Sequence, residues 1–86
     1  MTYEEAERTI LPGRYRHFKG RYYQVIGIAR HSETLEPMVV YRPLYGERGL
    51  WTRPARMWYE KVTVEGAEVT RFTPAEDTEG AENETV

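Results

Sequence analysis

The sequence predicts a mainly β protein, built as a small, strongly bent antiparallel sheet that closes into an SH3-like barrel. Between residues 13 and 54, β-branched and aromatic residues occur in short runs separated by glycine and proline, which is typical of strands joined by tight turns. Four or five such strands left as an open sheet would expose unpaired edges and an uncovered apolar face. We therefore expect closure, and an open meander completed by dimerisation is the alternative.

The expected strands follow from the runs of apolar residues, and a short helical turn is expected before the last of them. Lys19 and Gly20 form a tight hairpin turn, and Gly27 marks a bulge or bend in a long strand. Pro43 has no N–H to donate, so it belongs at an edge or a bulge. The run ARMWYEKV after Pro54 holds about two turns of helix-compatible residues. The strand runs are GRYRHF, RYYQVIGIAR, MVVYRPLYG, LWTRP and a final strand at 62–64 or longer.

The chain of 86 residues has room for one domain with a small core. Residues 1–12 are a lead-in that is compatible with a short helix, because Thr2 precedes acidic residues and a Pro-Gly pair ends the stretch. Residues 13–72 form the β-barrel domain. Residues 73–86 contain five acidic residues and no aromatic one, so we expect a disordered acidic tail.

Charge is divided unevenly along the chain, whose net charge is −2. Residues 11–64 contain ten basic and four acidic residues, a local charge of +6, whereas residues 65–86 contain seven acidic residues and one arginine, a local charge of −6. This division predicts a basic interaction surface and an acidic tail that competes for it.

Several classes of protein are disfavoured by what the sequence lacks. It contains no cysteine, which excludes disulfides, thiolate metal sites and a cysteine nucleophile. It has neither the pattern of a signal peptide nor a run approaching the roughly 20 apolar residues of a membrane span. We expect a soluble cytoplasmic protein without cofactor and without a membrane partner.

Four short motifs follow one another in the chain: G-x-Y-x-H-F-K-G from Gly13, A-x-H-S-E-T from Ala29, V-V-Y-x-x-L-Y from Val39 and W-x-R-P-x-x-M-W from Trp51. In this order they resemble the bacterial domain-of-unknown-function family 1653, over about residues 13–72 of the chain. Phenylalanine is usual in that family where this chain has Trp58. The resemblance implies a compact, stand-alone, β-rich domain and no activity that can be transferred to a residue.

The polar stretch RHSETLEP is interpreted as a turn and not as a reactive site. His31 and Ser32 are neighbours, and on a strand their side chains would point to opposite faces, so they do not make a credible base and nucleophile. Ser32 and Thr34 are expected to cap backbone groups in the turn. His17 and His31 could share a metal only with a third ligand. We predict no enzyme and no metal site.

Aromatic residues are more numerous than a core of this size can hold. Nine of them lie between Tyr15 and Tyr59, so several must be partly exposed. They either cover a thin core or form the wall of a groove. Consecutive Tyr22 and Tyr23 occupy opposite faces if both lie in a regular strand, so one of the two is core.

Arginines next to these rings favour nucleic acid as the ligand, because guanidinium groups and aromatic rings together bind bases and phosphates. Arg14 and Arg16 share one face of a strand, and Arg53 follows Trp51 on a same-face step. The alternative is an SH3-like module for a protein or peptide partner. A small-molecule pocket or enzyme is a third possibility, and we expect a monomer or weak homodimer. The candidate ligand-binding residues are Arg14, Arg16, His17, His31, Tyr41, Trp51, Arg53 and Trp58.

Overall fold

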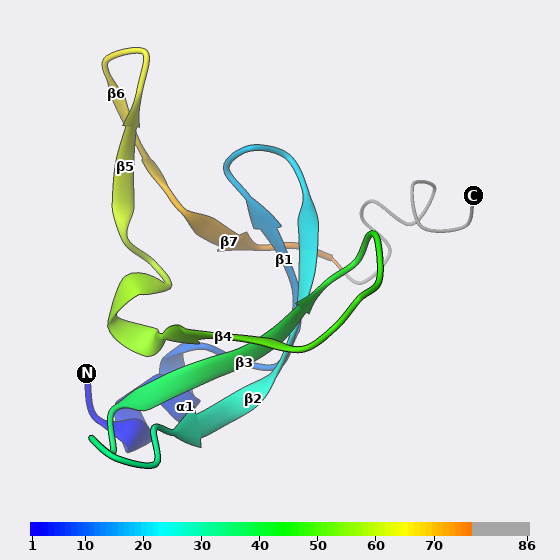
Figure 1. Cartoon of the computed structure of the whole chain (residues 1–86). Coiled ribbons are helices and arrows are strands. Elements are labelled where there is room, and N and C mark those ends of the chain that lie inside the picture. The colour runs from blue at the N-terminus through cyan, green and yellow to red at the C-terminus, as the bar shows by residue number, and fades with distance from the viewer. Residues whose placement is uncertain (77–86) are drawn as a thin grey trace.

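The computed structural model describes residues 1–76, and these confirm the predicted mainly β class (Figure 1). The elements are α1 (Tyr3–Thr9), β1 (Gly13–His17), β2 (Tyr22–Arg30), β3 (Pro37–Pro43), β4 (Trp51–Pro54), the 3-10 helix η1 (Ala55–Met57), β5 (Lys61–Val64), β6 (Ala67–Thr70) and β7 (Phe72–Pro74). The expected helical turn is η1, and it precedes β5 as predicted, but β5 is not the last strand, because β6 and β7 follow. No helix within residues 1–76 is long and apolar enough to cross a membrane.

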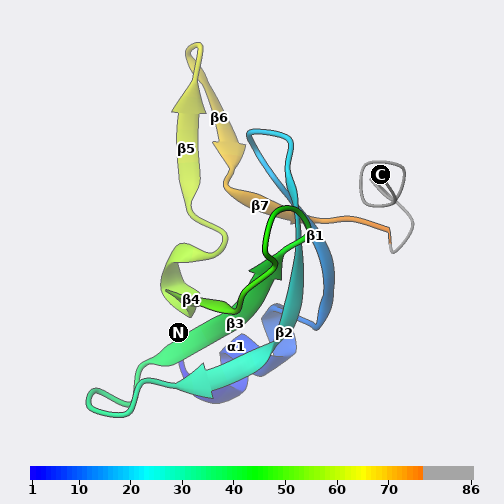
Figure 2. The same ribbon diagram turned by 45° about the vertical axis from the view of Figure 1, so that its right-hand side comes forward.

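Five strands form one antiparallel sheet in the order β4-β3-β2-β1-β7, and β5 pairs with β6 in a separate hairpin that projects from the body (Figure 2). Within the described residues β4 and β7 are edge strands, so the expectation of a closed barrel is wrong. The sheet can stay open because α1 and η1 supply a second layer. Ala6 and Ile10 from α1, together with Ala55, join the core cluster of the sheet, which buries the apolar face that closure would otherwise have to cover.

The sheet bends at a bulge in β2. Val25 pairs with Tyr41, whereas Gly27 pairs with Val40, so Ile26 is an extra residue on β2 without a partner in the ladder. This confirms the bend predicted at Gly27. Pro43 ends β3 beyond the residues that pair with β4, so its missing donor costs no hydrogen bond to that strand.

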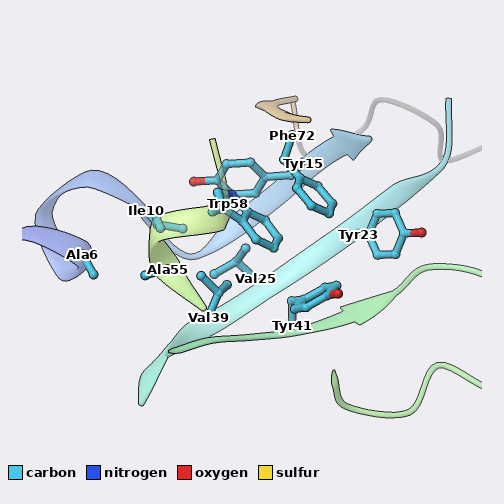
Figure 3. Close-up of a cluster of buried hydrophobic side chains, with 10 residues drawn as sticks. All are labelled: Ala6, Ile10, Tyr15, Tyr23, Val25, Val39, Tyr41, Ala55, Trp58 and Phe72. Atoms are coloured by element: carbon cyan, nitrogen blue, oxygen red, sulfur yellow. The ribbon is translucent and has the colours of Figure 1, made fainter. Parts of the chain in front are cut away.

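The core is small and dominated by aromatic rings (Figure 3). The Trp58 ring lies flat on the Phe72 ring, with 3.9 Å between centroids and 2° between planes. Tyr15 and Tyr41 both meet Trp58 edge to face. The buried residues are Ala6, Ile10, Tyr15, Tyr23, Val25, Val39, Tyr41, Ala55, Trp58 and Phe72.

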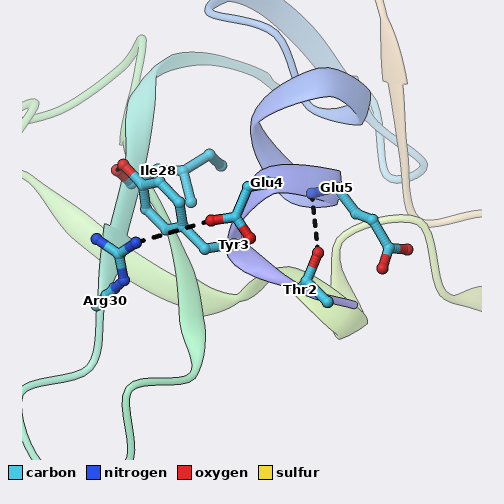
Figure 4. A network of polar contacts seen from close by, with 6 residues as sticks. All are labelled: Thr2, Tyr3, Glu4, Glu5, Ile28 and Arg30. Atoms are coloured by element: carbon cyan, nitrogen blue, oxygen red, sulfur yellow. Dashed lines mark hydrogen bonds and ion pairs between the residues drawn. The ribbon is translucent and has the colours of Figure 1, made fainter.

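The lead-in at 1–12 contains the helix that the sequence allowed. Thr2 is its N-cap, and the threonine hydroxyl accepts a hydrogen bond of 3.1 Å from the Glu5 N–H (Figure 4), which satisfies a donor that the helix itself leaves unpaired. The Arg30 guanidinium lies 3.8 Å from the Tyr3 ring centroid, and the Tyr3 hydroxyl donates to the Ile28 carbonyl at 3.4 Å. These contacts attach α1 to β2.

The end of the sheet lies later than the expected boundary after residue 72. Thr73 pairs with Arg16, Pro74 pairs with Tyr15, and the Ala75 N–H donates to the Arg14 carbonyl at 2.9 Å. The start of the expected disordered tail is therefore wrong, because backbone pairing with β1 holds these residues although they bury little apolar surface. The rest of the predicted tail, residues 77–86, lies outside the described residues.

Candidate functional site

The predicted ligand-binding residues divide between the two faces of the sheet. We call the face that carries Tyr15, Val25 and Val39 the inner face, and the opposite face the outer face. Residues that pair directly across antiparallel strands point to the same face. His17 pairs with Phe72, Trp51 with Tyr41, and Arg53 with Val39, which places the first member of each pair on the inner face.

Arg14 and Arg16 lie on the outer face. Arg14 pairs with Gln24, which pairs with Arg42, and Arg16 pairs with Tyr22. The two arginines share one face, as predicted, but the sheet separates them from Trp51. The eight candidates therefore do not form a single surface.

On the inner face, Tyr23 is the centre of a group of rings that we call the Tyr23 cluster. Its members besides Tyr23 are His17, Tyr41, Tyr45, Trp51 and Phe72, whose ring centroids lie between 5.5 and 6.4 Å from that of Tyr23. In Figure 3, the Tyr23 hydroxyl points away from Val25 and the rest of the core. It shares a hydrogen bond of 2.9 Å with the Tyr45 hydroxyl. Trp51 is 47% exposed, so the cluster runs from the core out to solvent.

Two guanidinium groups stack on this cluster. Arg21 lies 4.3 Å from the Tyr45 ring centroid, and Arg53 lies 5.6 Å from that of Phe72. Within residues 1–76 the Nε of Arg53 is shielded from solvent and has no hydrogen-bond partner. The terminal N–H groups of a guanidinium held over a ring are suited to bind an oxyanion beside a flat group.

The pKa of His17 is lowered by its surroundings in this site. Burial lowers the pKa of its imidazole first, and the charges of Arg71, Arg53 and Lys19 lower it further. The imidazole Nδ1 accepts a hydrogen bond of 3.1 Å from the Lys19 N–H. At neutral pH His17 is therefore an uncharged member of the cluster, surrounded by cations.

Arg71 is partly neutralised, unlike Arg53. One of its terminal nitrogens lies 2.8 Å from a carboxylate oxygen of Glu60, and its backbone N–H donates to the Glu60 carbonyl, also at 2.8 Å. These contacts fix the segment between β6 and β7 against the segment between η1 and β5. They leave Arg53 as the cation best placed to meet a ligand.

Two of the predicted site residues are core residues and are corrected here. Trp58 is fully buried and Tyr41 is 4% exposed. Trp58 is covered by Phe72 from β7 and by Tyr15 from β1, so neither of its faces is open to a ligand. Tyr41 belongs to the Tyr23 cluster as a buried member, whose ring packs against those of Tyr23 and Trp51.

His31 lies in the turn between β2 and β3, away from the cluster. Its Nδ1 accepts hydrogen bonds from the N–H groups of Glu33 and Thr34 at 3.1 and 3.3 Å, and the Thr34 hydroxyl accepts from the Glu36 N–H at 3.2 Å. This confirms the interpretation of the stretch as a turn and the capping expected of Thr34; the second capping side chain is His31, where Ser32 was expected. His17 and His31 flank opposite ends of β2, a strand of nine residues, so about 30 Å of strand separates them and they cannot share a metal.

Five residues of the site were missed from the sequence: Tyr23, Tyr45, Phe72, Arg21 and Arg71. The first two belong to the aromatic surplus that the sequence shows, but nothing in the sequence marks Tyr23 as their centre. Phe72 and Arg71 reach the site because β7 returns to pair with β1. That pairing joins residues more than fifty positions apart in the sequence, and no local sequence pattern predicts it.

Residues 1–76 contain no group of three or more His, Asp or Glu side chains that could hold a metal ion. A shallow pocket of about 260 Å³ is lined by residues that include Leu11, Arg14 and Tyr59. A second, of about 230 Å³, lies between Arg16, Phe18 and the valines of the β5–β6 hairpin. Neither pocket is lined by His17 or His31.

Comparisons with known proteins identify the family of this chain and bear on its fold. Residues 13–74 match the model of a family described as protein of unknown function (DUF1653). No curated protein matches the chain. A crystal structure of a DUF1653 protein from Bordetella bronchiseptica shares 40% sequence identity and superposes with a TM-score of 0.72, covering 79% of this chain and 90% of that one. The chain belongs to the DUF1653 family of proteins of unknown function.

Proposed function

We propose that this protein is a non-enzymatic binding module that takes single-stranded nucleic acid on the exposed part of the Tyr23 cluster. The observation that carries the proposal is the pair formed by Trp51 and Arg53 on edge strand β4. Both side chains point to the inner face, one same-face step apart, which is about 6.6 Å along a strand. An exposed ring and a guanidinium group thus stand side by side.

Trp51 supplies the surface for stacking. Tyr41 meets its ring edge to face, with 89° between the planes, which supports the indole without covering it from the solvent side. Stacking of one base on such a ring contributes about 1–3 kcal/mol. Because paired bases are already stacked within a duplex, this geometry favours an unpaired strand.

Arg53 supplies the contact to phosphate. Arg21 lies over Tyr45 of the cluster, and Lys19 lies over Phe18, whose ring packs beside His17, so a strand that stacks on Trp51 meets several cations. The five strands of the large sheet, all within residues 13–74, contain no acidic residue. Little in the sheet itself repels a polyanion.

The test is the affinity for a fluorescently labelled twelve-nucleotide oligouridine, measured by anisotropy at several salt concentrations. Trp51→Ala should weaken binding about 5- to 150-fold, which corresponds to the 1–3 kcal/mol of one stacked base. Arg53→Ala should weaken binding and reduce the salt dependence by about one phosphate contact. The controls are Leu50→Ala, exposed next to Trp51, and Arg16→Ala, exposed on the outer face; both should bind nearly as the wild type does.

A twelve-residue polyglutamate peptide separates this proposal from the protein-interaction alternative. It offers negative charge without bases, so it should compete poorly with the oligonucleotide. If it binds as tightly, the site is a site for acidic peptides. If Trp51→Ala has no effect on oligonucleotide binding, bases do not stack on Trp51 and the proposal fails. If neither ligand binds at low salt, the proposal fails.

A further inference from the structure

The β5–β6 hairpin has two chemically different faces. Residues that pair directly across the two strands share a face, and successive pairs alternate between the faces. One face, which we call the apolar face, consists of Val62, Val64, Ala67 and Val69. Thr63 pairs with Glu68 on the opposite, polar face. A hairpin with one wholly apolar face has the pattern of a sheet that packs against something.

The apolar face is largely uncovered in the single chain. Val64 is 39% exposed, and Ala67 is also exposed. Within residues 1–76, β5 and β6 pair only with each other. A two-stranded hairpin is marginally stable in water unless one of its faces packs, and an apolar patch on a projecting element is typical of an interaction site.

A groove separates this hairpin from the turn between β1 and β2, and the two rise side by side from the same end of the body (Figure 1 and Figure 2). Its volume is about 230 Å³, below the roughly 300–1,000 Å³ of most small-molecule sites, which favours inserted side chains over a whole ligand. The groove is lined by Arg16, Phe18, Val64, Val69, Thr70 and Thr73. Because Arg16 and Thr73 pair on the outer face, the groove lies across the sheet from the Tyr23 cluster.

The groove and the tip of the hairpin are complementary in charge. Arg16 is the cation that lines the groove, and within residues 1–76 no carboxylate forms an ion pair with it. Glu65 directly follows Val64 at the tip and is exposed, so the tip presents an apolar side chain beside a negative charge. One chain therefore carries both the groove and a segment that fits such a groove, which favours a second copy as the partner.

We propose that two copies of this chain form a weak two-fold dimer through their β5–β6 hairpins. The apolar faces pack on each other with the hairpins antiparallel, so the tip of each hairpin enters the groove of the other copy. Glu65 of one copy then lies against Arg16 of the other, and symmetry makes this contact twice. The surface is small, so the dimer should form only at high protein concentration. This inference does not depend on what the Tyr23 cluster binds.

The first test is sedimentation equilibrium of the full chain at low salt, over protein concentrations from micromolar to millimolar. Val64→Asp should raise the dissociation constant of the dimer at least about 100-fold, because it puts an unpaired carboxylate into each half of the interface. The matched control is Thr63→Asp, which adds the same charge on the polar face of the same strand and should leave the dimer in place. Both positions are exposed, so both variants should fold.

Charge reversal tests the contact itself. Glu65→Lys and Arg16→Glu should each weaken the dimer about 5- to 30-fold, since each removes two ion pairs. The double variant Arg16→Glu/Glu65→Lys restores opposite charges at both contacts, so it should dimerise more tightly than either single variant. Glu68→Lys makes the same charge change on the polar face and serves as the control with little effect.

A wild type that stays monomeric at millimolar concentration would overturn the proposal and leave the groove to a different protein. A dimer that persists in Val64→Asp, or a double variant no tighter than the single ones, would also overturn it. Loss of the dimer in Trp51→Ala would show that the copies associate through the Tyr23 cluster and not through the hairpins, which contradicts the proposal as well.

Discussion

Trp58 and Phe72 lie face to face, with 3.9 Å between their ring centroids. Trp58 directly follows η1, and Phe72 begins the edge strand β7. This contact therefore joins the layer that covers the sheet to one edge of the sheet. Phe72 also touches Tyr23 and carries Arg53 above its ring. Tyr23, Tyr41 and Phe72 belong both to the core and to the Tyr23 cluster, and Trp58 packs against two of them, Tyr41 and Phe72, so its packing affects the position of the candidate site.

Trp58→Ala should lower the free energy of unfolding by about 3–5 kcal/mol, the usual cost of removing a buried large aromatic side chain. Trp58→Phe should cost less than about 1.5 kcal/mol, because the indole N–H is buried and has no hydrogen-bond partner within residues 1–76, so its removal leaves no group unsatisfied. Urea unfolding of both variants measures the difference, and Trp51→Ala, at an exposed ring, serves as the control with little effect. Equal losses at the two positions would contradict the assignment of Trp58 to the core.

Stability should fall when the pH drops below about 6.5, in part because of His17. Its pKa is lowered in the folded state from the ordinary value of 6.5, so between the two values the unfolded chain binds more protons than the folded one. Under that condition the free energy of unfolding rises with pH, and the contribution of His17 is complete above 6.5 and lost on acidification. His17→Asn, which keeps an acceptor near the position of Nδ1, should flatten this part of the profile of unfolding free energy against pH.

The matched control for that profile is His31→Asn. The asparagine side chain can accept the turn hydrogen bonds that His31 Nδ1 accepts, and it lies away from the cations around His17. The two variants should therefore differ in their pH dependence below pH 6.5. If His17→Asn retains the full wild-type dependence, neither burial nor the surrounding cations lower the pKa of His17 in the folded protein.

Glu60→Gln should strengthen binding of the oligonucleotide at low salt. The substitution removes the carboxylate that neutralises Arg71 and leaves one more positive charge beside Arg53 and His17. Because the Glu60 carboxylate is partly exposed, the loss of the ion pair should cost no more than about 1 kcal/mol of stability. Anisotropy at several salt concentrations should show a steeper salt dependence; unchanged affinity would place Arg71 outside the binding surface.

Much of the sheet could be predicted from the sequence, because its strands carry their signals locally. The runs of β-branched and aromatic residues located β1 to β4, and Gly27 marked the bend in β2. The alternation in β3 separates buried Val39 and Tyr41 from Val40 and Arg42 on the other face, as the period of two requires. These features depend on neighbours in sequence.

Whether the sheet closes into a barrel, and which residues form the candidate site, depend on contacts between residues far apart in the sequence. These contacts could not be predicted from the sequence. Nothing in residues 1–12 shows that Ile10 packs on the sheet and so removes the need for a barrel. The sequence indicated that some rings must be exposed, but it could not distinguish Trp51 from Trp58. Only the return of β7, which places Phe72 against Trp58, decides which of the two is buried.

If unpaired bases stack on the exposed end of the Tyr23 cluster, the two tryptophans of the chain should respond differently to the ligand and so offer an internal control. Unlabelled oligouridine titrated into the ¹⁵N-labelled protein should shift the indole N–H of Trp51 progressively. The indole N–H of buried Trp58 and the side-chain amide of Gln24 on the outer face should move little. A titration that moves the Gln24 amide and leaves the Trp51 indole in place would contradict the account.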